Sequence, residues 1–189
     1  MALSLVTAPQ TEPISLVEAK AHLRVDVDDE NDLINTLRSV SREYGETFTH
    51  RAFVTQTWND VRGGFPGDDE AIWLPRPPLI SVTSVTYLDT AGVSQTWSSS
   101  LYTVTAPAGP KASAGSIVPN YGQIYPATRD VVNAVTIRFV AGYGAATEVP
   151  ALIKTCLKEH VRANYGRGIE KRDEILTWID RHLWAYKAF

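Results

Sequence analysis

The sequence contains few of the residues on which disulfide frameworks and thiol chemistry depend. It has one cysteine, Cys156, in 189 residues. A single cysteine excludes an internal disulfide framework and is typical of a protein from a reducing compartment. Cys156 lies among apolar residues at helical spacing, so we expect a packed and unreactive thiol.

Long hydrophobic runs are also missing. No apolar run approaches the roughly 20 residues that a membrane-spanning helix requires, so we expect no membrane partner. The first residues lack a basic segment followed by an apolar core, and we expect no signal peptide. The hydrophobic content of 44% is typical of a globular protein of this length with one good core.

Catalytic and cofactor-binding motifs are absent as well. The four histidines, His22, His50, His160 and His182, fall on four different predicted elements, without the paired spacing of a zinc helix. We expect them at the surface or at helix ends. There is no nucleophile elbow and no phosphate-binding loop.

Two short segments resemble cofactor or metal motifs but lack required residues. In Gly142–Thr147 a threonine stands where a dinucleotide fingerprint needs glycine or alanine, so we interpret the segment as a hinge between a strand and a helix. The acidic run that begins at Asp26 has Asn31 and Leu37 where a calcium loop needs glycine and glutamate. We therefore expect no metal, no cofactor and no enzyme. One alternative stays open, a carboxylate pair that only folding assembles. Its candidates are Asp60, Asp68, Asp69, Asp89 and Asp130.

The formal net charge of −3 is unevenly distributed. Residues 1–150 carry 10 basic and 16 acidic side chains, whereas residues 151–189 carry 8 basic and 5 acidic ones. An acidic body argues against DNA binding, which depends on neutralising phosphates. The basic C-terminal part favours an acidic partner surface, unless it is simply a solvated face.

Helical signals occur at both ends of the chain. A capping box at Ser15 and Glu18 predicts a helix that ends near residue 23 or 24. A second helix is predicted over about 29–48, a third from Pro150 to Gly166, and a last one over about 170–186. The second helix has a narrow apolar stripe that must pack on another helix or on a neighbouring subunit. The stripe consists of Leu33, Leu37, Val40, Tyr44 and Phe48.

Between the helical parts the pattern changes to period two, with turn residues between short segments. Such spacing is typical of an antiparallel sandwich or small barrel. The predicted strands are 53–61, 71–74, 80–88, 93–97, 102–105, 115–118 and 134–143. The expected fold is therefore α+β, a helical bundle formed by residues 1–52 and 144–189 with a β domain inserted at 53–143.

Three segments carry a resemblance to a known family. The most informative is Trp73–Gly92, in which Pro75, Pro77 and Pro78 hold the backbone extended before a β-branched run. The other two are 13–34 and 139–154. Together, in this order, they resemble the bacteriophage head–tail connector (adaptor) proteins, which sit beneath the portal ring.

The resemblance implies a structural role. Such a protein forms a ring, expected to be dodecameric, docks on the portal protein, joins the capsid to the tail and offers a platform for a stopper or tail-completion protein. DNA passes through the lumen without specific binding. The expected location is the neck of the virion, after synthesis in the cytoplasm of the bacterial host. Two alternatives remain, a neck stopper or tail-completion protein, and a soluble β-sandwich enzyme or ligand-binding module.

Two sets of interaction residues are predicted. The first is a subunit interface along the helices, where a small bundle is expected to leave apolar side chains exposed. Its members are Ile34, Leu37, Tyr44, Ile153 and Leu157. The second is a portal-docking element at the C-terminus, where aromatic residues occur on more than one side of the last helix. Its members are Trp178, Ile179, Arg181, Leu183, Trp184, Tyr186, Lys187 and Phe189. For part of this second set, the alternative is one more helix of the bundle.

Overall fold

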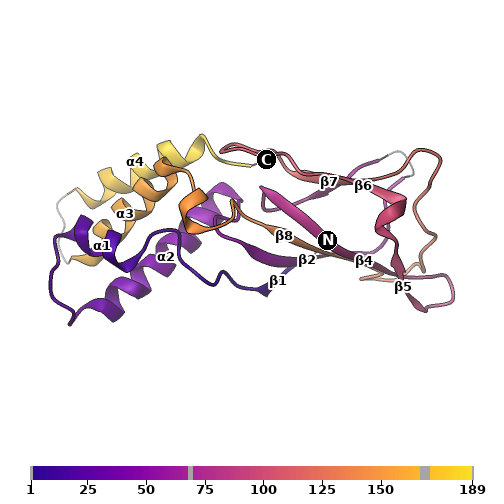
Figure 1. Cartoon of the computed structure of the whole chain (residues 1–189), viewed down its shortest axis with the longest axis horizontal. Helices are drawn as coiled ribbons and strands as arrows, with labels where there is room; N and C mark the ends of the chain where they lie inside the picture. The colour runs from indigo at the N-terminus through magenta and orange to yellow at the C-terminus, as the bar shows by residue number, and fades with distance from the viewer. Residues whose placement is uncertain (1, 68–69, 167–170, 189) are drawn as a thin grey trace.

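A computed structural model describes residues 2–67, 70–166 and 171–188. Figure 1 shows an elongated molecule with the helices gathered at one end and most of the strands at the other. The predicted α+β class is confirmed. The elements in chain order are β1 (Ala2–Thr7), α1 (Leu16–Leu23), α2 (Asn31–Thr49), β2 (Gln56–Arg62), β3 (Ile72–Leu74), β4 (Leu79–Leu88), β5 (Ser94–Trp97), η1 (Ser99–Leu101), β6 (Tyr102–Thr105), β7 (Gly115–Pro119), β8 (Val135–Ala141), η2 (Ala146–Glu148), α3 (Ala151–Tyr165) and α4 (Arg172–Trp184).

The four α-helices form one bundle around a single apolar core. α2 packs on α3, and both α1 and α4 pack on this central pair. The capping box predicted for α1 is present, with the Ser15 hydroxyl accepting from the Glu18 N–H and the Glu18 carboxylate accepting from the Ser15 N–H. The buried residues of the bundle core are Ile14, Ala19, Ile34, Phe53, Val54, Val149, Ile153, Cys156, Leu157, Val161, Ile179, Leu183 and Tyr186.

The β domain consists of two antiparallel sheets around a second core. One sheet has the order β1-β2-β8-β4-β5 and the other the order β3-β7-β6. β8 lies at the centre of the larger sheet, and every second side chain from Val135 to Ala141 is buried, as expected for a strand with one face on the core. Aromatic rings fill part of this core, and each contacts at least one other ring with centroids 4.7–5.5 Å apart. These residues are Phe65, Trp97, Tyr102 and Tyr125.

The structure differs from the sequence prediction at two places. β1 was not predicted, yet it pairs with β2 from Ala2 opposite Val61 to Thr7 opposite Thr57, so part of segment 1–52 belongs to the sheet and not to the bundle. The proline segment is not extended throughout, because Arg76 has a φ of 62° and the Pro77–Pro78 peptide is cis. This segment is therefore a turn between β3 and β4.

A buried polar junction joins the bundle to the β domain. The Glu46 carboxylate, near the end of α2, accepts hydrogen bonds from the Phe53 N–H at 2.8 Å and from the Gln56 side chain, and it pairs with Arg42 at 3.0 Å. Arg76 donates to the Glu46 carbonyl at 2.9 Å. Burial raises the pKa of Glu46, although its hydrogen bonds and Arg42 act in the opposite direction. One carboxylate thus connects α2 to the start of the inserted domain.

Arg51 makes a second connection at this junction. Its side chain is buried and donates to the Tyr186 carbonyl, beyond α4, and at 2.7 Å to the Ala112 carbonyl in the loop between β6 and β7. The Ala188 N–H also donates to the Thr49 carbonyl at 2.8 Å. The segment that follows α4 is therefore held against the junction, and its position relative to both domains is set.

Candidate interaction surfaces

The described part of the chain has no arrangement suited to metal or thiol chemistry. Among these residues, no group of three His, Cys, Asp or Glu side chains is placed to hold a metal ion. Cys156 is buried, and burial raises the pKa of its thiol to about 11. Within the same residues, no helix combines the length and the apolar character that crossing a membrane requires.

A serine and a histidine meet inside the bundle, but their geometry is structural. Ser41 donates its hydroxyl proton to the Leu37 carbonyl at 2.7 Å. The histidine is therefore the donor in the 2.9 Å hydrogen bond between His160 Nδ1 and Ser41 Oγ. Both residues are buried, the His160 ring stacks on Tyr44 with centroids 4.4 Å apart, and burial lowers the pKa of His160. Our expectation that His160 is a surface or helix-end residue was wrong. The two residues are 119 positions apart, and no local pattern indicates their contact.

The residues predicted for a subunit interface face the interior of their own subunit. Ile34, Ile153 and Leu157 are buried in the bundle core, and Leu37 and Tyr44 are partly buried against it. The expectation that a small bundle leaves these side chains exposed was wrong, because α1, α4 and the connections at Phe53 and Val149 cover them.

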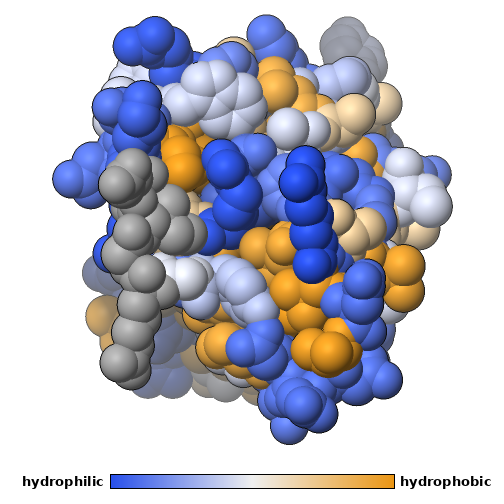
Figure 2. All heavy atoms as spheres, turned by 90° about the vertical axis from the view of Figure 1, so that its left-hand side faces the viewer, coloured by the Kyte–Doolittle hydropathy of each residue, from blue (hydrophilic) through white to orange (hydrophobic). Residues whose placement is uncertain are grey.

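Other apolar side chains of α1 and α2 are exposed instead. Leu33 and Val40, placed by the sequence pattern on the packed stripe, are 46% and 45% exposed. Val17 of α1 and Val27 before α2 are exposed as well. Figure 2, which views the helical end, shows apolar side chains gathered over part of this end between charged ones. We define the outer stripe of α2 by the exposed residues Asp32, Leu33, Thr36, Val40, Glu43 and Thr47.

The predicted docking element divides into core and surface residues. Ile179, Leu183 and Tyr186 are buried in the bundle core, so for these three the docking assignment is corrected to that of a bundle helix. The reason is that α4 packs on both α3 and α2. The remaining described members are accessible, with Trp178 37% and Trp184 57% exposed, Arg181 exposed and Lys187 partly so. Lys187 Nζ lies 4.8 Å from the centroid of the Trp184 ring. Phe189 lies outside the described residues.

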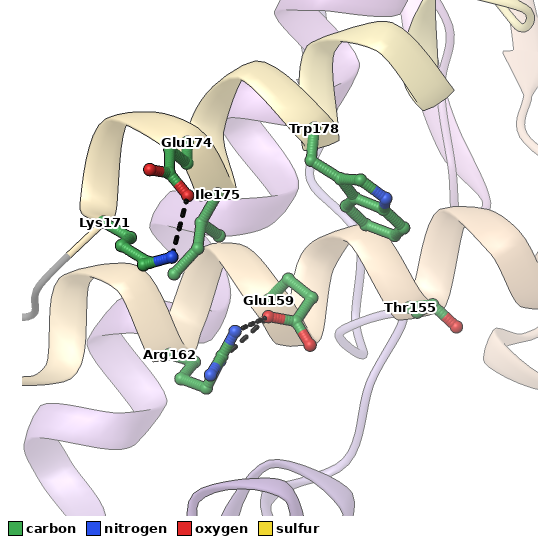
Figure 3. A pocket seen from close by; sticks show the side chains of 7 residues that line it. All are labelled: Thr155, Glu159, Arg162, Lys171, Glu174, Ile175 and Trp178. Carbon is green, nitrogen blue, oxygen red and sulfur yellow. Dashed lines mark hydrogen bonds and ion pairs between the residues drawn. The ribbon is translucent and has the colours of Figure 1, made fainter.

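A groove of about 510 Å³ runs between α3 and α4, and Figure 3 shows the side chains that line it. Trp178 and Ile175 contribute its apolar part from α4. Its carboxylates are already paired, since Glu159 contacts Arg162 at 2.6 Å and Glu174 contacts the side chain of Lys171 at 3.6 Å. Thr155 completes the lining on α3. The groove thus offers an exposed tryptophan with no unpaired acid beside it.

A larger groove of about 920 Å³ lies where the segment after α4 meets the β domain. Its lining includes Leu3 of β1, the exposed Trp73 of β3, and Lys187. Several large accessible side chains therefore surround the end of the chain, some in this groove and one, Trp184, on α4. Sequence reasoning missed the groove because β1 was not predicted.

The fold is a four-helix bundle with an inserted β domain of two antiparallel sheets. Chains with a similar fold occur in solved structures of virions and virion necks. One is the neck of an empty gene transfer agent (GTA) particle computed with C6 symmetry, and another is the virion of a native GTA particle. Each has a TM-score of 0.78 and 19% identity over 100% of this chain and 96% of that chain. A third, the neck of a native GTA particle computed with C12 symmetry, has a TM-score of 0.70 and 18% identity over the same shares. At these identities the likeness establishes the fold.

Residues 13–102, just under half of the chain, match the model of the phage gp6-like head-tail connector protein family. The family resemblance noted from the sequence is confirmed over this segment, which runs from the start of the bundle to β6. A comparison with curated proteins finds no significant match.

Proposed function

We propose that this protein is a structural adaptor of the virion neck, which forms a ring beneath the portal, joins the capsid to the tail and continues the DNA channel. The observation that carries the proposal is the likeness of the whole chain to GTA neck and virion proteins, together with the head-tail connector match. Two of the matched neck structures were computed with C6 and C12 symmetry. This supports a cyclic assembly, and a dodecamer is the form that we propose.

The proposed partners are the portal protein, further copies of this chain and a stopper or tail-completion protein. DNA is proposed to pass through the lumen without specific contacts. The role that we propose is assembly without turnover.

Portal docking is proposed for the exposed side chains near the end of α4. Trp184 is the principal candidate, because large aromatic residues are the commonest hot spots of protein interfaces, and because its neighbours Arg181 and Lys187 supply positive charge. The junction contacts of Arg51 and Thr49 hold this region in a defined position. A prepositioned surface loses less entropy on binding than a free tail.

The test is binding to isolated portal rings, measured by cosedimentation and by electron microscopy of the complex. The wild-type chain is expected to add a ring of density to one face of the portal. Trp184→Ala is expected to weaken binding at least tenfold. The matched control is Tyr121→Ala, which removes a fully exposed aromatic side chain from the connection between β7 and β8 and is expected to bind as the wild type does. Absence of any portal complex with the wild-type chain would contradict the proposed function.

A further inference from the structure

Two partly apolar surfaces lie on opposite sides of the bundle and differ in the charge around them. The first is the outer stripe of α2, in which Leu33 and Val40 are nearly half exposed. The second is the groove between α3 and α4 with Trp178 at its edge. In Figure 3 the groove faces the reader and α2 runs behind α3 and α4. One subunit therefore cannot bring its own stripe into its own groove.

The stripe side of the bundle is acidic. Residues 15–49, which contain α1 and α2, carry eight acidic and four basic side chains. Two of the bases on α2 are engaged within the subunit, since Arg38 donates to the Ile14 carbonyl at 2.8 Å and Arg42 pairs with Glu12 and Glu46. By contrast, the carboxylate of Asp32 has no partner among the described residues. The second acid of the stripe, Glu43, pairs with Arg42 at 3.6 Å. The stripe thus presents apolar side chains beside one unpaired carboxylate, that of Asp32.

The C-terminal part of the chain, which forms the groove, is basic overall, although the charged residues that line the groove are two acids and two bases. Residues 151–189 carry eight basic and five acidic side chains. The acids in the groove are each paired with a base, and Arg181, one turn beyond Trp178, has no side-chain partner within the described part of the chain. An acidic, partly apolar helix surface matches this groove better than a neutral or basic one would.

We infer that the groove between α3 and α4 receives the outer stripe of α2 from a second copy of this chain. The inference rests on the proposed function and names the contact between neighbouring subunits of the ring. Because the two surfaces differ and lie on opposite sides, the contact is head to tail. Such contacts generate a closed ring when the rotation between copies closes. In this arrangement Trp178 belongs to the subunit contact, and Trp184 is left for the portal.

Crosslinking between introduced cysteines tests the contact, because the native Cys156 is buried and its thiol has a raised pKa of about 11. Val40→Cys places a thiol on the stripe and Thr155→Cys places one in the groove. The double variant, assembled into rings with or without portal and treated with a short bis-maleimide, is expected to give a ladder of multimers. Each single variant is expected to stay mostly monomeric on a denaturing gel. A double variant of Val40→Cys with Thr105→Cys, an exposed position on β6, is the control and is expected to give no ladder.

A second arm measures assembly itself. Val40→Asp is expected to reduce ring formation at least tenfold while the circular dichroism spectrum is unchanged, because the replaced side chain is exposed in the single subunit. Val93→Asp, at a 55% exposed position beside β5, is the matched control and is expected to assemble normally. Raised salt is expected to weaken the wild-type rings, since screening reduces attraction between exposed charges.

The outcomes separate the inference from the proposed function. Rings that form normally but give no Val40–Thr155 ladder would overturn the inference alone. So would efficient dimers of the Val40→Cys single variant, which indicate a symmetric contact, or normal assembly of Val40→Asp. A wild-type chain that forms no ring, alone or on portal, would overturn the proposed function and the inference together.

Discussion

Gly142 illustrates how a single position fixes the connection between the two domains. It follows β8, has a φ of 127°, and a Cβ built on it would lie 2.4 Å from the Val54 carbonyl oxygen. The sequence pattern indicated a hinge at this segment. The structure gives the physical reason, which is that the backbone of the returning chain passes directly against the backbone that leaves the bundle.

Replacing Gly142 by alanine is therefore expected to destabilise the protein by about 3 kcal/mol, since both the backbone conformation and the close approach oppose a side chain. The measurement is the free energy of unfolding in urea. Gly109→Ala is the matched control, because Gly109 also has a positive φ, of 109°, but nothing within 4 Å of its Cβ position. We expect the control to cost about 1 kcal/mol. Equal costs for the two variants would contradict the proposed close contact.

Glu18 gives a prediction for pH dependence. Burial tends to raise the pKa of Glu18, but the hydrogen bonds from Ser15 and the ion pair with Lys154 at 3.0 Å outweigh it and lower the pKa from 4.5 to about 2. A depressed pKa in the folded state means that the unfolded state binds more protons in this range. The stabilising contribution is therefore complete above pH 4.5 and is lost as the pH falls toward 2.

We expect Glu18→Gln to cost about 0.5 kcal/mol at neutral pH, a small value because the carboxylate is partly exposed and solvent screens its interactions. The difference in unfolding free energy between variant and wild type should shrink as the pH falls below 4.5. A difference that stays constant over this range would show that the charge of Glu18 does not contribute.

At the scale of elements, α4 serves two purposes on two faces. Its inner face contributes Ile179 and Leu183 to the bundle core, and its outer face presents Trp178 and Trp184. Aromatic density at the end of the chain indicated a binding element, but a count of apolar residues does not separate the face that packs from the face that binds. That separation depends on where α2 and α3 lie.

Leu183→Ala is accordingly expected to cost about 2–5 kcal/mol, as for other large side chains removed from a packed core. Trp184→Ala is expected to change the unfolding free energy by about 0.5 kcal/mol or less, as for most surface positions. Urea unfolding followed by circular dichroism measures both. A truncation after Asp173 removes both Ile179 and Leu183 from the core, and it should therefore unfold the bundle. A stable truncated protein would contradict the assignment of α4 to the core.

The sequence was informative about elements and less so about the contacts between them. The capping box located α1, and period-two patterns located β4, β5 and β6 to within a residue. β1 was missed because Ala2–Thr7 has no strong alternation and its partner β2 begins about 50 residues later. On α2 the apolar spacing identified the helix but not its buried face, since Leu33 and Val40 fit the same spacing as Leu37 and Tyr44. Burial of Ile34 depends on α3, α4 and the interdomain connections, which no local pattern describes.

At the scale of the whole molecule, the two ends are chemically different. The bundle end contains the stripe and the groove, the segment after α4 lies at the junction between the two domains, and the connection between β7 and β8 lies at the opposite end (Figure 1). The loop at 106–114 is tied to the junction through Arg51 and through the hydrogen bond from the Tyr143 hydroxyl to the Pro110 carbonyl. It is therefore unsuited to the role of a distal contact loop, and shortening it would disturb the junction.

The β7–β8 connection is the better candidate for a distal contact, because it exposes Tyr121 fully and Ile124 and Val132 largely. Isolated exposed apolar residues are ordinary, but three on one connection at the tip of an elongated subunit favour a binding role. A triple replacement of these residues by serine tests this role. We expect it to leave folding, ring formation and portal binding unchanged, because none of the three residues belongs to either core. Attachment of tails to filled heads should fall at least tenfold, as counted by electron microscopy of assembled particles. Portal binding is the internal control, since we propose that it depends on the exposed side chains near the end of α4. Normal tail attachment by the triple variant would show that the distal connection faces solvent, and loss of portal binding would show that the two ends do not act independently.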